Sequence, residues 1–143
     1  ILLRERISEM FLSEEGSLIS LQCMSFGFKY GYPSEADMVF DVRCFPNPFY
    51  IPELKHKTGL DNEVRDYVLG SADTQEFLTR LRAMLDHLLP LYAAEGRTRM
   101  VVAIGCTGGK HRSVSFAWRM AEELRREQEN VFFTGRYFRK VKA

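Results

Sequence analysis

The stretch that most constrains the fold is VVAIGCTGGKHRSV, residues 101–114. It continues an apolar, β-branched run that starts near Arg99, and this run predicts a strand that is buried on both faces and ends at Gly105. After the glycines, apolar residues recur at helical spacing and predict a helix that starts near His111 or Arg112. A strand, a Gly-rich turn and a helix in direct succession place the turn at the carboxyl edge of a sheet, where α/β proteins bind ligands.

The rest of the chain continues this alternation. Residues 17–26 and 37–45 predict two earlier strands, and residues 130–133 predict a last one. Three prolines within residues 46–52 force an irregular connection. Apolar residues spaced by three and four over residues 73–92 predict an amphipathic helix. The element order predicts an α/β fold, with a mainly parallel central sheet flanked by helices in a single compact domain.

The two ends of the chain differ from this central part. The chain opens at Ile1 without an initiator methionine, so we expect residues 1–16 to be a helix or linker that follows a missing upstream domain. Residues 17–133 are expected to form the α/β domain. Residues 134–143 contain no acid and are expected to form a basic C-terminal tail.

Composition excludes several classes of protein. No apolar run reaches the roughly 18 residues that span a bilayer, so we expect a soluble protein without membrane contact, and the odd number of cysteines favours a reduced, cytoplasmic setting. Three widely spaced cysteines argue against a disulfide framework: Cys23, Cys44 and Cys106. The three histidines do not lie at metal-ligand spacing from these cysteines, so no metal site is expected.

The turn itself has the composition of an anion cradle. Its glycines allow consecutive backbone N–H groups to converge on one anion, and the following helix start adds a partial positive charge. Charged and hydroxyl side chains supply further donors. The candidate ligands in the turn are Thr107, Gly108, Gly109, Lys110, His111, Arg112 and Ser113. A phosphate is the type of ligand that this donor set favours.

Two phosphate-binding motifs compare differently with the turn. A nucleotide P-loop requires a glycine at position 104 and Ser or Thr at position 111, but these positions hold Ile104 and His111. The pattern of Cys106, Gly109, Arg112 and Ser113 instead resembles the phosphate loop of cysteine-dependent phosphatases. In that alternative, the Cys106 thiolate attacks phosphorus, Arg112 holds its oxygens and Asp41 protonates the leaving group.

Four blocks in the same order are similar to another family: MSFGFKYG, ADMVFDVRCFPNP, TGLD and VVAIGCTGGKHRSV. They resemble the C-terminal domain of the RapZ family of RNase adapter and nucleotide-binding proteins, and the resemblance extends from about Leu21 to about Asn130. It implies that ATP or GTP binds only to a P-loop domain upstream of this one, so no cofactor is expected in this domain.

The resemblance implies a regulatory binding module rather than an enzyme. Enterobacterial members bind small regulatory RNAs, present them to an endoribonuclease, sense glucosamine-6-phosphate and self-associate. Transferred to this sequence, the sugar phosphate binds at Cys106, Thr107, Gly108, Gly109, His111 and Arg112, with Asp41 and Arg43 across the pocket. An ion pair of Asp41 with Arg43 or Arg112 is the alternative for these two side chains. Phe49 stands where some members have a polar ligand contact.

Basic residues late in the chain are candidates for RNA contact: Arg125, Arg126, Arg136, Arg139, Lys140 and Lys142. Tyr137 and Phe138 lie between them, where their rings are placed to stack on unpaired bases. In the alternative, Phe132, Phe133 and Phe138 are core residues of a terminal strand. The resemblance and the aromatic content of 11 Phe, 6 Tyr and 1 Trp together predict a homo-oligomer. The resemblance alone implies a ribonuclease as an additional partner.

Overall fold

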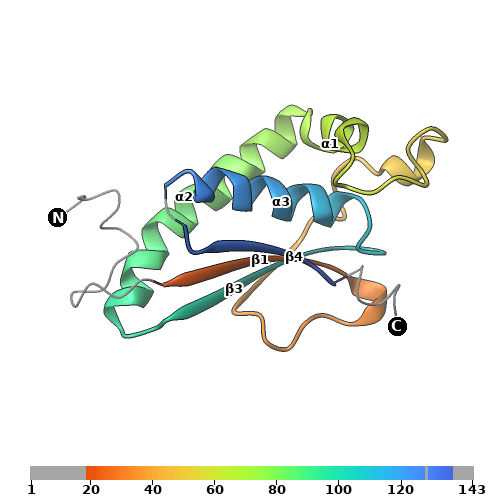
Figure 1. Ribbon diagram of the computed structural model, residues 1–143. Helices are drawn as coiled ribbons and strands as arrows, with labels where there is room; N and C mark the ends of the chain where they lie inside the picture. The colour runs from red at the N-terminus through yellow and green to blue at the C-terminus, as the bar shows by residue number, and fades with distance from the viewer. Residues whose placement is uncertain (1–18, 128, 137–143) are drawn as a thin grey trace.

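Four parallel β-strands form the sheet in a computed structural model that describes residues 19–127 and 129–136 (Figure 1). The strands are β1 (Ser20–Gly27), β2 (Met38–Asp41), β3 (Arg99–Cys106) and β4 (Val131–Gly135), in the spatial order β2-β3-β1-β4. Each neighbouring pair is parallel, which confirms the predicted α/β class and sheet type. The predicted N-terminal segment 1–16 lies outside the described residues.

Three α-helices accompany the sheet in the described part of the chain: α1 (Asn62–Leu69), α2 (Ala72–Ala94) and α3 (Arg112–Arg125). The helices predicted over residues 73–92 and from Arg112 correspond to α2 and α3. α2 begins at a capping Ser71, whose hydroxyl accepts a hydrogen bond from Thr74 N at 3.1 Å. α1 is not predicted. None of the described helices is long and apolar enough to cross a membrane.

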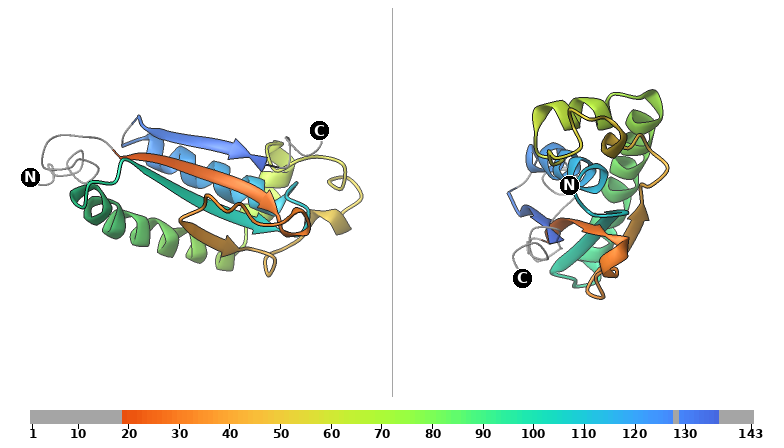
Figure 2. Two further views of the ribbon diagram at one scale, coloured as in Figure 1. Left: turned by 90° about the horizontal axis from the view of Figure 1, so that it is seen from below. Right: turned by 90° about the vertical axis from the view of Figure 1, so that its right-hand side faces the viewer.

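The helices cover one face of the sheet, as Figures 1 and 2 show. Alternate strand residues such as Leu21 and Ile104 join Leu85 of α2 and Phe116 of α3 in one hydrophobic core. The ring of Phe45, which follows β2, packs 5.1 Å from the ring of Phe116. This contact fixes the connection after β2 against the first half of α3.

The connections that leave β1, β2 and β3 gather at the carboxyl edge of the sheet, on the right in Figure 1. β1 continues into a 3-10 helix, Phe28–Tyr30, and the connection after β2 contains a second one, Pro48–Tyr50. β3 leads directly into the turn before α3. The backbone N–H of Lys29 donates to the carbonyl of Thr107 at 3.1 Å, which joins the first connection to the turn. Three distant parts of the sequence therefore meet at this edge.

Candidate anion-binding site

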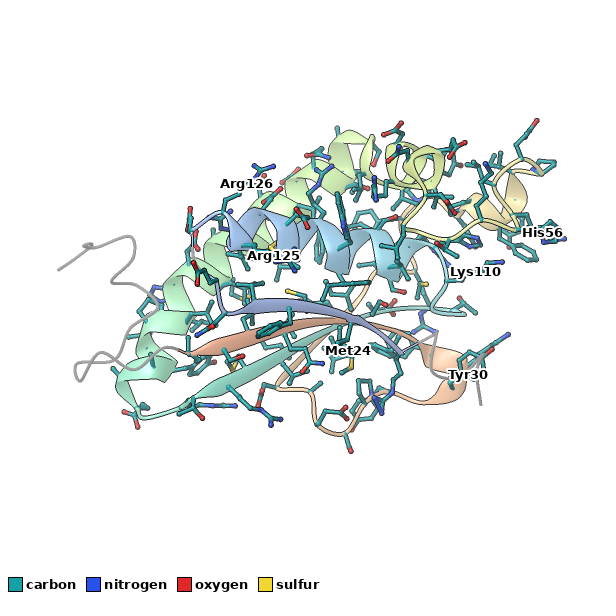
Figure 3. The ribbon with its side chains drawn as sticks, in the orientation of Figure 1. Met24, Tyr30, His56, Lys110, Arg125 and Arg126 are labelled. Atoms are coloured by element: carbon teal, nitrogen blue, oxygen red, sulfur yellow. The ribbon has the colours of Figure 1, made fainter. Side chains whose placement is uncertain are left out.

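A pocket of about 450 Å³ lies at the carboxyl edge of the sheet. Its floor is formed by Cys106, Thr107, Gly108, Lys110, His111 and Arg112. Its rim is formed by Lys29, Tyr30, Asn47, Phe49 and Tyr50. Figure 3 shows Tyr30 and Lys110 at the same end of the molecule. The residues that line the pocket include three cations and no Asp or Glu, so its potential is positive.

Two glycines allow the floor to lie directly against the end of β1. Gly109 has a φ of +76°, which other residues rarely adopt, and a Cβ at this position would lie 2.6 Å from Gly27 N. A Cβ on Gly27 would lie 2.5 Å from the carbonyl carbon of Gly108. A side chain at either position would displace the backbone. The close approach of Gly109 and Gly27 therefore fixes the position of the turn against the end of β1. Gly27 is not among the predicted site residues.

Arg112 is the first residue of α3 and is only 5% exposed. Its Nη1 donates to the carbonyl oxygens of Arg43 at 2.6 Å and Phe45 at 3.2 Å, which ties the floor to the connection after β2. Its Nε is buried and has no hydrogen-bond partner among the described residues. A buried charged donor without a partner is costly, and an anion in the pocket would reduce this cost.

His111 is buried beside Arg112, and its role depends on its charge. Its Nε2 lies 3.1 Å from the carbonyl oxygen of Lys55, which can only accept, so Nε2 carries the proton. Burial lowers the pKa of His111, and the charge of Lys110 lowers it further. The ring is therefore neutral at pH 7.

Cys106 and Ser113 face each other inside the turn. The Cys106 thiol donates to Ser113 Oγ at 3.2 Å, and Ser113 N donates to Cys106 Sγ at 3.4 Å. Ser113 is fully buried and, like Gly109, does not line the pocket. These contacts connect the end of β3 to the start of α3. Cys106 also lines the pocket, although it is only 3% exposed.

Asp41 and Arg43 form an ion pair beside the pocket and do not line it. Arg43 Nη2 lies 2.7 Å from Asp41 Oδ2, and Arg43 Nε lies 3.0 Å from Oδ1. Hydrogen bonds from Arg43 lower the pKa of Asp41, so its carboxylate is ionised at neutral pH. The Arg43 guanidinium also lies 4.1 Å from the centre of the Phe28 ring. The ion pair between Asp41 and Arg43, which the sequence allowed as an alternative to ligand binding, is therefore present in the structure.

The rim contains four residues that the predicted site omits: Lys29, Tyr30, Asn47 and Tyr50. They come from the segments FGFKYG and PNPFYIP. In both segments aromatic residues lie beside glycine or proline, and this pattern could have indicated a binding surface on a loop. Asn47 Oδ1 accepts a hydrogen bond from Phe49 N at 3.0 Å and so caps the 3-10 helix that carries the rings of Phe49 and Tyr50.

The basic residues predicted to contact RNA lie in two places. Arg125 and Arg126 are at the end of α3, where Arg125 pairs with Glu122 at 2.6 Å (Figure 3). Because α3 runs back from the pocket, this end lies at the opposite edge of the sheet. Arg136 follows β4, at the carboxyl edge, and pairs with Glu35 at 3.1 Å. Arg139, Lys140 and Lys142 lie outside the described residues.

The fold and the pocket define an α/β domain with a positively charged, glycine-rich turn at the carboxyl edge of a parallel sheet. The described residues contain no group of three or more His, Cys, Asp or Glu side chains that could hold a metal ion. The family model of the RapZ C-terminal domain matches residues 19–139. The chain therefore belongs to the RapZ C-terminal domain family.

Curated relatives support this membership. The chain is 53% identical over 131 residues to a nucleotide-binding protein of Caldicellulosiruptor bescii, a match that covers 90% of this chain and 43% of the relative. It is 50% identical over 123 residues to a nucleotide-binding protein of Bacillus cytotoxicus, covering 86% of this chain and 42% of the relative. The chain spans less than half the length of these relatives.

Proposed function

We propose that this domain is a regulatory binding module that holds a phosphorylated sugar of the glucosamine-6-phosphate type. The observation that carries the proposal is the buried guanidinium of Arg112, which lines a pocket with two lysines and no carboxylate and has an unpartnered Nε. The phosphate binds at the floor, where Arg112, Lys110 and the start of α3 supply positive charge. Asn47 and Thr107 provide polar groups for sugar hydroxyls.

Calorimetric titration with glucosamine-6-phosphate tests this proposal. Arg112→Ala should lose at least the roughly 1.5–3 kcal/mol of binding free energy that is typical of a hydrogen bond to a charged group. Arg126→Ala is the matched control, because Arg126 is an exposed arginine at the opposite edge of the sheet. Thermal unfolding of both variants verifies that they are folded, and Arg112→Lys separates the charge of the side chain from its forked geometry. Equal affinities of the wild type and Arg112→Ala for glucosamine-6-phosphate would show that its phosphate does not bind in this pocket.

The phosphatase alternative requires a proton donor that the site supplies poorly. Asp41 is ionised, paired with Arg43 and outside the pocket lining, so it has no proton to give to a leaving group at neutral pH. This supports binding rather than hydrolysis. Phosphate release should be followed in the same titration. Steady release by the wild type that disappears in Cys106→Ser would favour the enzyme, whereas a binding module keeps most of its affinity in Cys106→Ser.

We propose that RNA binding by this domain starts at the carboxyl edge, with Arg136 and the basic residues that follow it in the sequence. Neutralising phosphates makes such binding fall steeply with salt. Arg136→Gln combined with removal of residues 137–143 should weaken retention of a single-stranded RNA more than Arg126→Gln does. The reverse order would place the contact at the end of α3 instead.

Self-association and a ribonuclease partner are further proposals that rest on the family. β2 and β4 are the outer strands of the sheet, and outer strands offer backbone groups for pairing. Sedimentation at roughly tens of micromolar, a concentration suited to a modest interface, should detect an oligomer. We propose that the nucleotide after which these relatives are named binds to a part of them that this chain does not cover.

A further inference from the structure

We infer that the rim of the pocket is a binding site for a nucleobase, so that the ligand class includes a nucleoside 5′-monophosphate unit. This inference rests on the proposed function, because it places the phosphate of that unit on the same floor. It goes beyond a sugar phosphate by assigning the rim to a planar aromatic group. The floor recognises the phosphate, and the rim recognises what the phosphate carries.

The first observation is the aromatic surface of the rim. Phe49 and Tyr50 are 49% and 76% exposed, and both line the pocket together with Tyr30 from another connection. Large exposed rings are costly to leave in water, and several rings around one pocket indicate a binding surface. The rings of Phe49 and Tyr50 are nearly perpendicular, with centroids 5.7 Å apart. Such a corner allows a flat ligand to stack on one ring and contact the edge of the other.

The second observation concerns the contacts that position the rings of Phe49 and Tyr30. The backbone N–H of Phe49 is capped by Asn47 at 3.0 Å, and Lys55 Nζ lies 4.7 Å from the centre of the Phe49 ring. On the other side of the rim, Lys29 Nζ lies 5.3 Å from the centre of the Tyr30 ring. Sites for single-stranded nucleic acid combine aromatic rings, on which bases stack, with basic groups that neutralise phosphates, and both are present around this pocket.

The third observation concerns charge. An amino sugar carries an ammonium group, but no carboxylate is among the residues that line the pocket. The nearby carboxylate of Asp41 is engaged by two nitrogens of Arg43. A nucleobase is neutral and flat, so it can stack on the exposed rings of the rim and needs no carboxylate partner. The pocket volume of about 450 Å³ is within the range of small-molecule sites and exceeds what a phosphate alone occupies.

Calorimetric titration of the full chain with ribose 5-phosphate, AMP and UMP tests the inference. Both nucleotides should bind roughly 5- to 100-fold more tightly than ribose 5-phosphate, which corresponds to the stacking of one base. Phe49→Leu and Tyr50→Leu should reduce this ratio toward one, because the base loses its stacking surface. Tyr67→Leu is the control, because Tyr67 is an exposed aromatic on α1 that does not line the pocket.

Saturation-transfer NMR on wild-type protein supplies a readout that does not depend on a variant. Base protons of AMP should receive saturation from the protein more strongly than ribose protons. If ribose 5-phosphate and glucosamine-6-phosphate bind and the nucleotides bind no more tightly than ribose 5-phosphate, the inference is wrong and the proposed function stands. If no phosphorylated ligand binds, both are wrong.

A further titration distinguishes two sources of the nucleoside 5′-monophosphate unit, a free nucleotide and the 5′ end of an RNA chain. A trinucleotide with a 5′-phosphate should bind at least as well as AMP if the site accepts the 5′ end of an RNA chain, and the 5′-hydroxyl form should bind more weakly. Binding of AMP without binding of the 5′-phosphorylated trinucleotide assigns the site to a free nucleotide. Tighter binding of the 5′-hydroxyl form than of the 5′-phosphate form would contradict placement of the phosphate on the floor.

Discussion

The floor and the rim of the pocket are built in different ways. The floor rests on closely packed backbone: Gly109 lies against Gly27, Arg112 is buried, and Cys106 is hydrogen-bonded to Ser113. The rim consists of exposed side chains on short connections, such as Phe49 and Tyr50. A substitution at these packed positions should lower stability, while a substitution in the rim should change mainly what the pocket contacts. We therefore propose that the floor holds the anion and that the rim selects which anion binds.

The largest expected effect is that of Gly109→Ala on stability. The new methyl group forces a positive φ on alanine, which costs about 1–3 kcal/mol, and it meets Gly27 N at 2.6 Å, which adds a similar amount by overpacking. Urea unfolding measures the sum. Gly108→Ala is the control, because nothing lies within 4 Å of a Cβ at that position and its φ is not positive. Equal stability of the two variants would show that the floor is not packed as described.

Loss of the Arg112 side chain should have the next largest effect. Arg112→Met removes the donors to the carbonyl oxygens of Arg43 and Phe45, and these part-buried acceptors then lose partners, at a cost of up to about 1–3 kcal/mol each. The variant also removes a charge whose Nε has no partner among the described residues, which offsets part of that cost. We expect a net loss of about 1–2 kcal/mol in urea unfolding. Addition of sulfate should raise the melting temperature of the wild type but not of Arg112→Met.

A smaller effect should appear in the dependence of stability on pH, and it arises from His111. The folded protein lowers the pKa of this ring from its ordinary value of 6.5, so the unfolded chain binds a proton at a higher pH than the folded one. The stability that the neutral His111 ring contributes is fully present above pH 6.5. It is lost as the pH falls through the lowered pKa that the ring has in the folded protein. His111→Gln should flatten this part of the profile in urea unfolding between pH 5 and 8. An unchanged slope would show that the ring is not buried as a neutral group.

The same difference explains which parts of the molecule the sequence could predict. The turn lies within nine consecutive residues, so its glycines, Arg112 and the flanking strand and helix are recognisable from local patterns. The rim joins Tyr30 to Phe49, and only the pairing of β1 with β3 and the packing of Phe45 on α3 bring these two together. Helix α1 was missed for a related reason, since it spans only eight residues and its few apolar positions gain stability from contact with α3.

The smallest expected effect is that of Tyr50→Leu on stability. Tyr50 is 76% exposed, so replacing its ring removes little buried surface and should change the free energy of unfolding by less than about 0.5 kcal/mol. Urea unfolding of this variant should therefore overlay that of the wild type, and its affinity for inorganic phosphate should be unchanged because the floor is intact. A loss comparable to that of Gly109→Ala would mean that the rim is part of the core. The functional separation of floor and rim would then have no structural basis.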